Sequence, residues 1–199
     1  MDLGRVAVYE AASITGERHE AAVLVPVITR AGEPHLLFTK RADHLGEHPG
    51  QMSFPGGGRE PSDETLQETA LREAEEEIGL RPGEVDPVGR LDDIITVSRY
   101  TVRPFLARVP DRAYDPDERE VAEIAVLPVP AFTDASNYES ERREHPQFGE
   151  VLVHFFHVSG YTVWGATARI LVQLLELATD WRAPELGERV GETGADPDR

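Results

Sequence analysis

The chain has 199 residues, and its 37 Asp and Glu against 20 Lys and Arg give a formal net charge of −17. This acidity opposes non-specific binding to nucleic acid, because neutralising phosphates requires basic side chains. The absence of cysteine excludes disulfides and thiolate metal sites. No apolar run reaches the roughly 18 residues that a membrane span needs. We therefore expect a cytoplasmic protein that binds neither nucleic acid nor membrane.

The acidic residues run through the whole chain, and Lys40 is the only lysine among the basic residues. We interpret this composition as an adaptation to high salt, in which a hydrated acidic surface stays soluble while its self-repulsion is screened. Ordinary acidic composition is the alternative. Unfolding of the protein in low-salt buffer would favour this interpretation, and stability that does not depend on salt would exclude it.

The length favours one domain with its own core, which we expect to span residues 1–182. The remaining residues, 183–199, are rich in Gly, Glu, Asp and Pro and poor in apolar side chains. Such a segment cannot bury enough apolar surface to fold, so we expect an acidic, disordered tail.

The first strands are expected from apolar runs. Residues 1–20 are polar and mixed, and we expect a short strand or helix there. The run at 21–29 predicts a strand that is buried on both faces. After a turn at 32–34, residues 35–39 return as its hairpin partner. A short strand at 52–54 then leads into a run of glycines, where the missing side chains permit close approach of the backbone to phosphate.

The second half of the chain continues with strands and ends in a helix. Further strands are expected at 88–91, 100–109, 120–127 and 151–158. Pro104 argues that its strand is an edge strand or contains a bulge. The long polar stretch 133–147 is a candidate loop or lid, and 164–181 has helical periodicity. The order of elements implies an α/β fold in which a mixed sheet lies between helices.

The most informative stretch is a predicted helix that ends near Gly79. Glu, Gln, Ala, Leu and Arg are good helix formers, Asp63 is a plausible N-cap, and Gly79 stands where a left-handed C-cap belongs. Apolar residues recur at steps of three and four, namely Leu66, Ala70, Leu71, Ala74 and Ile78.

Three glutamates of this helix, Glu73, Glu76 and Glu77, fall within an arc of roughly 100° because i, i+3 and i+4 share a face. Their mutual repulsion costs helix stability unless a cation lies among them. Mg²⁺ pairs such carboxylates with the phosphate oxygens of a substrate. A solvated acidic helix face is the alternative.

The pattern around these glutamates favours the metal site. Gly58, five residues, Glu64, seven residues and then the run from Arg72 to Leu80 fit G-x5-E-x7-R-E-U-x-E-E-x-G-U, where U is apolar. The stretch resembles the Nudix box. The resemblance implies an α/β/α sandwich and a hydrolase of nucleoside diphosphates linked to another group. It also implies that Glu73, Glu76 and Glu77 hold Mg²⁺ or Mn²⁺.

A second resemblance concerns the substrate. Leu37 to Ala42, Gly50 and the run Phe54 to Gly57 are similar to the signature of the coenzyme A diphosphatase subfamily, L-L-T-x-R-[SA]-x3-R-x3-G-x3-F-P-G-G. Val163-Trp164-Gly165 is similar to the start of its closing helix. The spacing to Arg72 is one residue longer than in the commonest Nudix proteins, as in that subfamily. Gly57 is then the family's usual glycine, and Glu64 does not necessarily hold the role that the general box assigns it.

The subfamily resemblance implies substrate contacts at Arg41, Gly50, Phe54, Gly56 and Gly57. Core packing is the alternative for Phe54, and a surface salt bridge is the alternative for Arg41.

The signature's second arginine falls on Gly46. The chain must then use other cations near the phosphates or accept another substrate. The candidates are Lys40, Arg41, His44 and His48, and a solvated loop is the alternative for the histidines.

The Nudix resemblance also implies a mechanism, in which a metal-bound water attacks one phosphorus in line. Arg72 would orient the carboxylates. Glu120 is the candidate general base, with a surface acid at a strand end as the alternative. Coenzyme A would yield 3′,5′-ADP and 4′-phosphopantetheine.

Two rival functions stay open, and neither is excluded by the sequence. The chain could hydrolyse ADP-ribose or another dinucleotide, or it could be a non-catalytic nucleotide-binding module. The intact glutamate set argues against the second. A homodimer is left open.

Overall fold

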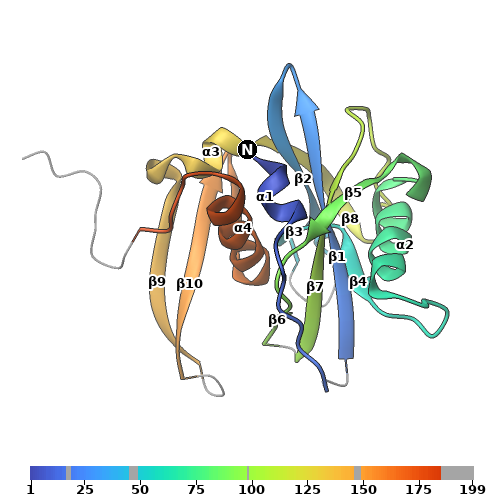
Figure 1. The fold of residues 1–199 in the computed structure, drawn as a ribbon, viewed down its shortest axis with the longest axis horizontal. Helices are drawn as coiled ribbons and strands as arrows, with labels where there is room; N and C mark the ends of the chain where they lie inside the picture. Colours follow the sequence, from blue (N-terminus) through green and yellow to red (C-terminus); the bar gives the residue numbers. More distant parts are fainter. Residues whose placement is uncertain (17–18, 45–48, 98, 146–148, 185–199) are drawn as a thin grey trace, which may run out of the picture.

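The computed structural model describes residues 1–16, 19–44, 49–97, 99–145 and 149–184. A mixed β-sheet forms its centre (Figure 1). The sheet has the spatial order β3 (Met52–Ser53), β2 (Glu33–Arg41), β1 (His19–Arg30), β7 (Tyr100–Arg108), β5 (Asp86–Arg90), while β4 (Gly56–Gly58) pairs with β1, β6 (Ile94–Ile95) with β7, and β8 (Val121–Pro128) with β2. Strands β1 and β7 are parallel, and the other pairs are antiparallel.

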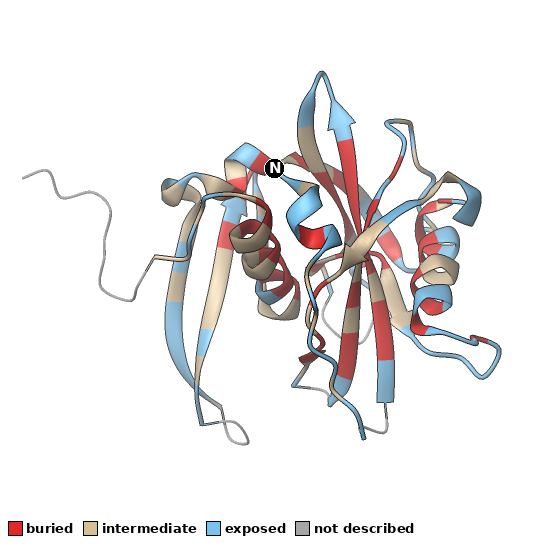
Figure 2. Cartoon of the chain, in the orientation of Figure 1, coloured by how far each residue is buried: buried red, intermediate tan, exposed pale blue. Residues whose placement is uncertain are grey.

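Helices cover both faces of this sheet. Helix α2 (Leu66–Ile78) lies on one face, and α1 (Leu3–Ala7) and α4 (Gly165–Ala178) lie on the other (Figure 1). Alternation along β2 explains the two layers, because Leu37 packs in the α2 layer while Leu36 and Phe38 pack in the α4 layer. Buried residues follow the central strands and the inner sides of both helices (Figure 2). The expected α/β/α sandwich is confirmed.

In the part of 133–147 that the structure describes, which ends at residue 145, a strand of a second sheet stands where a loop or lid was expected. Strands β9 (Tyr138–His145), β10 (Gly149–Val158) and β11 (Tyr161–Trp164) form an antiparallel sheet, reached through α3 (Val129–Thr133) and the 3₁₀ turn η2 (Ala135–Asn137). The polar sequence of β9 misled the prediction. An edge strand with open faces tolerates charged side chains, and cross-strand ion pairs such as Arg142–Glu150 support it.

The start of α2 also differs from expectation. Thr65 is the N-cap, and its hydroxyl accepts from the Glu68 N–H while the Glu68 carboxylate accepts from the Thr65 N–H. This reciprocal capping box leaves Asp63 free for another partner. Gly79 ends the helix with φ of 63°, as predicted.

Pro104 lies in an interior strand, so the predicted edge or bulge is wrong at this residue. Its carbonyl accepts from the Leu91 N–H at 3.0 Å, which places its nitrogen on the side where β5 has ended and β6 has not begun. The missing N–H therefore costs no ladder hydrogen bond.

The remaining differences are small. The first hairpin turns at Ala31 and Gly32, with φ of 51° and 84°, as a two-residue hairpin turn of the primed type needs. A 3₁₀ turn, η1 (Pro82–Glu84), follows α2. No described helix is long and apolar enough to cross a membrane. Of the predicted tail, 183–199, the residues after 184 lie outside the described residues.

A buried ion pair fastens the N-terminal segment to the sheet. Asp93 has a side chain that is 0% exposed. It accepts two hydrogen bonds from Arg103, at 2.8 and 2.7 Å, and one from the Ile14 N–H at 2.9 Å. Burial alone would raise the pKa of Asp93, but these hydrogen bonds and the charges of Arg103 and Arg90 outweigh it and lower the pKa.

We expect Asp93→Asn to lower the free energy of unfolding by on the order of 3 kcal/mol, because it breaks a buried pair. The folded pKa lies below that of an unfolded aspartate, about 3.9. The stabilisation is therefore present above that pH and is lost as the pH falls through the folded pKa. Asp111→Asn, which breaks the exposed pair with Arg30, should have little effect. If urea titrations at pH 7 gave equal losses of unfolding free energy for Asp93→Asn and Asp111→Asn, this account would be contradicted.

Candidate active site

Helix α2 lies directly against the glycine strand β4. A Cβ atom on Gly57 would fall 2.5 Å from the Glu73 carboxylate. On Gly56, with φ of 154°, it would fall 2.3 Å from the Ala22 carbonyl oxygen. Gly56 therefore requires glycine because of the backbone of β1, whereas a side chain at position 57 would displace the Glu73 carboxylate. The strand thus presents bare backbone beside an acid of the predicted metal site.

Glu77 is the most deeply buried of the three glutamates of α2 that were predicted to hold the metal, with 8% exposure. Its carboxylate accepts from the Gly56 N–H at 3.2 Å. Burial, together with the charges of Glu73 and Glu120, raises its pKa to about 8, while the Gly56 hydrogen bond and the charge of Arg41 oppose the rise. Burial also raises the pKa of Glu73. Two carboxylates thus lie where a cation would be strongly favoured.

Arg72 supplies the positive charge among these acids. Its Nη1 donates to Glu73 and to Glu76, each at 3.0 Å, and its Nη2 donates to the Gly58 carbonyl at 3.1 Å. Glu76 is the exposed member, with 59% of its side chain accessible. Within the described ranges, no three acidic, histidine or cysteine side chains converge as metal ligands. Glu76 instead accepts a hydrogen bond from Arg72.

Asp63 is the partner of Arg72 that the sequence did not reveal. It accepts from Nε and Nη2 of Arg72, both at 3.1 Å, and from the hydroxyl of Thr69 at 3.0 Å. The hydrogen bonds from Arg72 lower the pKa of Asp63 to about 2. Glu64, the box residue by spacing, is exposed and does not pair with Arg72. Counting the extra residue, Gly57 followed by five residues leads to Asp63, which is the signal that could have identified it.

The upstream signature brings Arg41 to the same region. Gly50 donates its N–H to the Arg41 carbonyl at 3.1 Å, and Arg41 donates its N–H to the Gln51 carbonyl at 3.0 Å. The charge of Arg41 opposes the rise in the pKa of Glu77. Arg41, the last residue of β2, therefore lies within electrostatic reach of Glu77.

Glu120 joins the site from the segment before β8. Its carbonyl accepts from the Ala42 N–H at 2.8 Å, which ties it to the end of β2. Its charge raises the pKa of both Glu73 and Glu77. The structure thus gathers Glu73, Glu77, Arg41 and Glu120 from three separate parts of the chain.

Other predicted contacts lie elsewhere. Phe54 is 2% exposed and stacks on Phe38, with ring centroids 4.7 Å apart, so it packs in the core and does not face a substrate. His44 contacts the Arg119 carbonyl at 3.0 Å. Gly46 and His48 lie outside the described residues.

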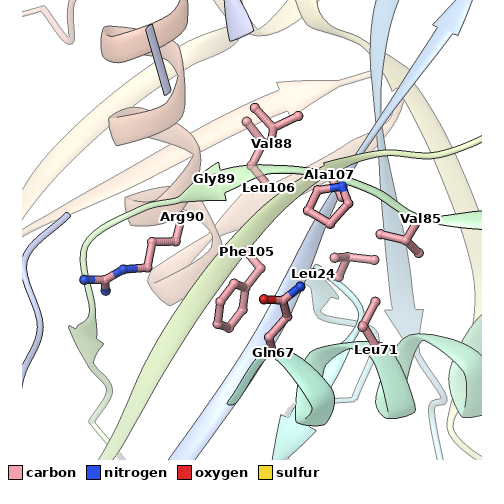
Figure 3. A pocket seen from close by; sticks show the side chains of 11 residues that line it. Leu24, Gln67, Leu71, Val85, Val88, Gly89, Arg90, Phe105, Leu106 and Ala107 are labelled. Carbon is pink, nitrogen blue, oxygen red and sulfur yellow. The ribbon is translucent and has the colours of Figure 1, made fainter. Parts of the chain in front are cut away.

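A cavity of about 280 Å³ lies on the far side of α2. Gln67 and Leu71 of α2 line it together with residues of β5 and β7 (Figure 3). At 100° per residue, Leu71 lies well over 100° from the three glutamates around the helix. The cavity has no acidic lining residue, so it is separate from the acidic site.

The two neighbouring glycines give a matched test of the close approach. We expect Gly57→Ala to displace the Glu73 carboxylate while the fold persists, because the clash is with the end of a flexible side chain. Gly58→Ala should be tolerated, since its nearest neighbour, Tyr100, lies 4.0 Å away. Calorimetric titration with Mn²⁺ should show weaker binding for Gly57→Ala alone, with thermal unfolding as the check on folding. Equal affinities in the two variants would contradict the account.

Comparisons with known proteins identify the family of this chain. The NUDIX domain family matches residues 18–151. NudL of Yersinia enterocolitica, described as an uncharacterized Nudix hydrolase, is 37% identical over 172 residues, which cover 82% of this chain and 84% of the relative. NudL of Enterobacter sp. strain 638 is 38% identical over 161 residues, with coverages of 79% and 81%.

Solved structures are similar in fold. A MutT/nudix family protein from Enterococcus faecalis has a TM-score of 0.55 at 11% identity, over 82% of this chain and 62% of that chain. A NUDIX hydrolase from Alicyclobacillus acidocaldarius has a TM-score of 0.50 at 19% identity, over 60% and 83%. The fold, the family match and the relatives together show that this chain belongs to the Nudix family and is a hydrolase acting on phosphorus-containing anhydrides.

Proposed function

We propose that this Nudix hydrolase cleaves the diphosphate bond of coenzyme A or its derivatives to 3′,5′-ADP and 4′-phosphopantetheine. The observation that carries the proposal is the position of the upstream signature. The charge of Arg41, whose carbonyl accepts from the Gly50 N–H, acts on Glu77, and the glycine strand β4 lies against Glu73 and Glu77. A substrate diphosphate at these acids would meet the cation and the bare backbone that the signature provides.

The acids fit a hard divalent cation. Nudix hydrolases generally use ions such as Mg²⁺ or Mn²⁺, and oxygen ligands of this kind suit both. Glu73, Glu76 and Glu77 would hold the ion after Glu76 leaves Arg72. When bound, the ion supplies charge neutralisation for the diphosphate and acidifies a water molecule.

The protein groups around the ion have distinct roles in this proposal. Arg72, fixed on one side by Asp63, orients Glu73 and takes no part in the chemistry. Glu120 accepts the proton of the attacking water, for which its position near Glu73 and Glu77 is suitable. Arg41 and the backbone of Gly50, Gly56 and Gly57 position the phosphates, and Phe54 supports them from the core.

The first test compares wild type with two variants of neighbouring glutamates in Mg²⁺ or Mn²⁺ at high salt. We expect wild type to release 3′,5′-ADP from coenzyme A. Glu76→Gln should lower kcat about 100-fold or more, because metal stabilisation of charge is worth several kcal/mol. Glu75→Gln, an exposed acid outside the predicted metal set, should retain the rate. Chromatography of the released 3′,5′-ADP measures the rate of wild type and of each variant.

Two outcomes would replace the proposal. Cleavage of ADP-ribose but not of coenzyme A would keep the reaction class and change the substrate, and Gly46 in place of the second signature arginine would then be the first residue to examine. Binding of these compounds without turnover would indicate a nucleotide-binding module.

The ion pair between Arg72 and Asp63 gives a second test. We expect Asp63→Ala to lower kcat by about 10- to 100-fold, the typical effect of removing the group that orients a metal ligand. Glu64→Ala, which removes the residue that the general box would select, should be nearly silent. Rates and thermal unfolding are measured together, so that misfolding is recognised. Loss of activity in Glu64→Ala with a normal Asp63→Ala would contradict the assignment.

A further inference from the structure

Arg119 is a cation near the acids of α2 that has no role in the mechanism above. It lies in the connection between β7 and β8, and 87% of its side chain is exposed. The hydrogen bond and charge of Asp117 raise the pKa of Arg119, and the charges of Glu120 and Glu76 raise it further. Arg119 is therefore within electrostatic reach of two acids of the candidate site.

Hydrogen bonds hold this connection against the site on two sides. The Asp117 N–H donates to the Glu77 carbonyl at 3.0 Å, which ties the connection to the last turn of α2. On the other side, the Arg119 carbonyl contacts Nε2 of His44 at 3.0 Å, and the carbonyl of the next residue, Glu120, is bonded to the chain just after β2. The backbone of Arg119 is thus placed between the acidic helix and the segment that follows β2.

The Arg119 guanidinium is held along one edge only. Its Nε donates to both carboxylate oxygens of Asp117, at 2.9 and 3.0 Å, and its Nη2 donates to the same carboxylate. Among the described residues, no acceptor is bonded to Nη1. An exposed ion pair of this kind contributes little to folding. A guanidinium that is fixed on one side and open on the other is, however, a prepared donor for phosphate oxygens.

The burial of the acids indicates which phosphate Arg119 would meet. The charge of Arg41 acts on Glu77, the buried acid. The charge of Arg119 acts on Glu76, whose side chain is mostly exposed. A diphosphate held by Arg41 and the backbone of β4 therefore leaves Arg119 for a phosphate on the solvent side, outside the bond that is cleaved.

We propose that Arg119 binds a phosphate group of the substrate that is not part of the reacting diphosphate. The inference rests on the proposed function and deepens it, because coenzyme A carries one such group, its 3′-phosphate, and ADP-ribose carries none. Arg119 would supply the cation that the upstream signature lacks at Gly46. Because it lies on a separate segment of the chain, the spacing of the signature does not reveal it.

The test uses Mg²⁺-loaded protein and two probes, 3′,5′-ADP and 5′-AMP, which differ only by the 3′-phosphate. Calorimetry should show that wild type binds 3′,5′-ADP more tightly. Arg119→Ala should weaken the binding of 3′,5′-ADP about 10-fold, the loss expected for a hydrogen bond between charged groups, and leave that of 5′-AMP nearly unchanged. Arg119→Lys should recover part of the affinity, because the charge remains while the planar fork is lost.

Arg30→Ala is the matched control. Arg30 is exposed and donates Nε and Nη2 to the carboxylate of Asp111 in the same manner, but no acid of α2 acts on it. We expect wild-type affinity for both probes in this variant, and thermal unfolding checks the folding of every variant. If Arg119→Ala kept the preference for 3′,5′-ADP, or if Arg30→Ala lost it to the same extent, the inference would be overturned.

Activity assays separate this inference from the proposed function. If coenzyme A is cleaved, Arg119→Ala should raise KM for coenzyme A and leave KM unchanged for the form that lacks the 3′-phosphate. A preference for 3′,5′-ADP that depends on Arg119, without cleavage of coenzyme A, would retain the phosphate site and reject the coenzyme A proposal. Cleavage of coenzyme A by a wild type that binds both probes equally would retain the proposed function and overturn the phosphate site.

Discussion

One guanidinium governs the arrangement of charge in the site. Arg72 bonds to carboxylates on three sides, namely Asp63, Glu73 and Glu76, and also holds the carbonyl of Gly58. Without it, the glutamates of α2 would repel one another and destabilise the helix. Because Asp63 takes one edge of the guanidinium, only Nη1 faces the acids of the helix. Arg72 thus permits the acids to coexist, but its single positive charge does not neutralise all of them. The site therefore has a deficit of positive charge.

Glu77 shows where that deficit is greatest. It is the buried acid, its pKa is raised to about 8 by burial and by neighbouring acids, and it forms no salt bridge among the described residues. An acid in such a place costs free energy unless a cation or a proton compensates it. The glycine strand explains why the chain keeps it there. Gly56 donates a hydrogen bond to Glu77, and Gly57 leaves room for Glu73, so that backbone and carboxylates can face one phosphate group together.

Much of this could be predicted from the sequence, because local rules agree with the fold there. The helix that carries Glu73, Glu76 and Glu77 was predicted, and the structure brings Glu73 and Glu77 to β4 while Glu76 bonds Arg72. The apolar pattern predicted the central strands. Asp63 was misassigned as an N-cap because capping preference is local, whereas its true partner lies nine residues ahead. Segment 133–147 was mistaken for a loop because its strand β9 is polar and is stabilised by pairing with β10, which composition does not reveal.

The central claim is that the acids of α2 hold a metal ion in place of the contact between Glu76 and Arg72. The most direct measurement is a crystal structure with Mn²⁺, in which anomalous scattering locates the ion. The account predicts a peak among Glu73, Glu76 and Glu77, with the Glu76 carboxylate turned away from Arg72 and the bonds between Asp63 and Arg72 retained. A peak elsewhere, or Glu76 still bound to Arg72 at saturating Mn²⁺, would contradict it.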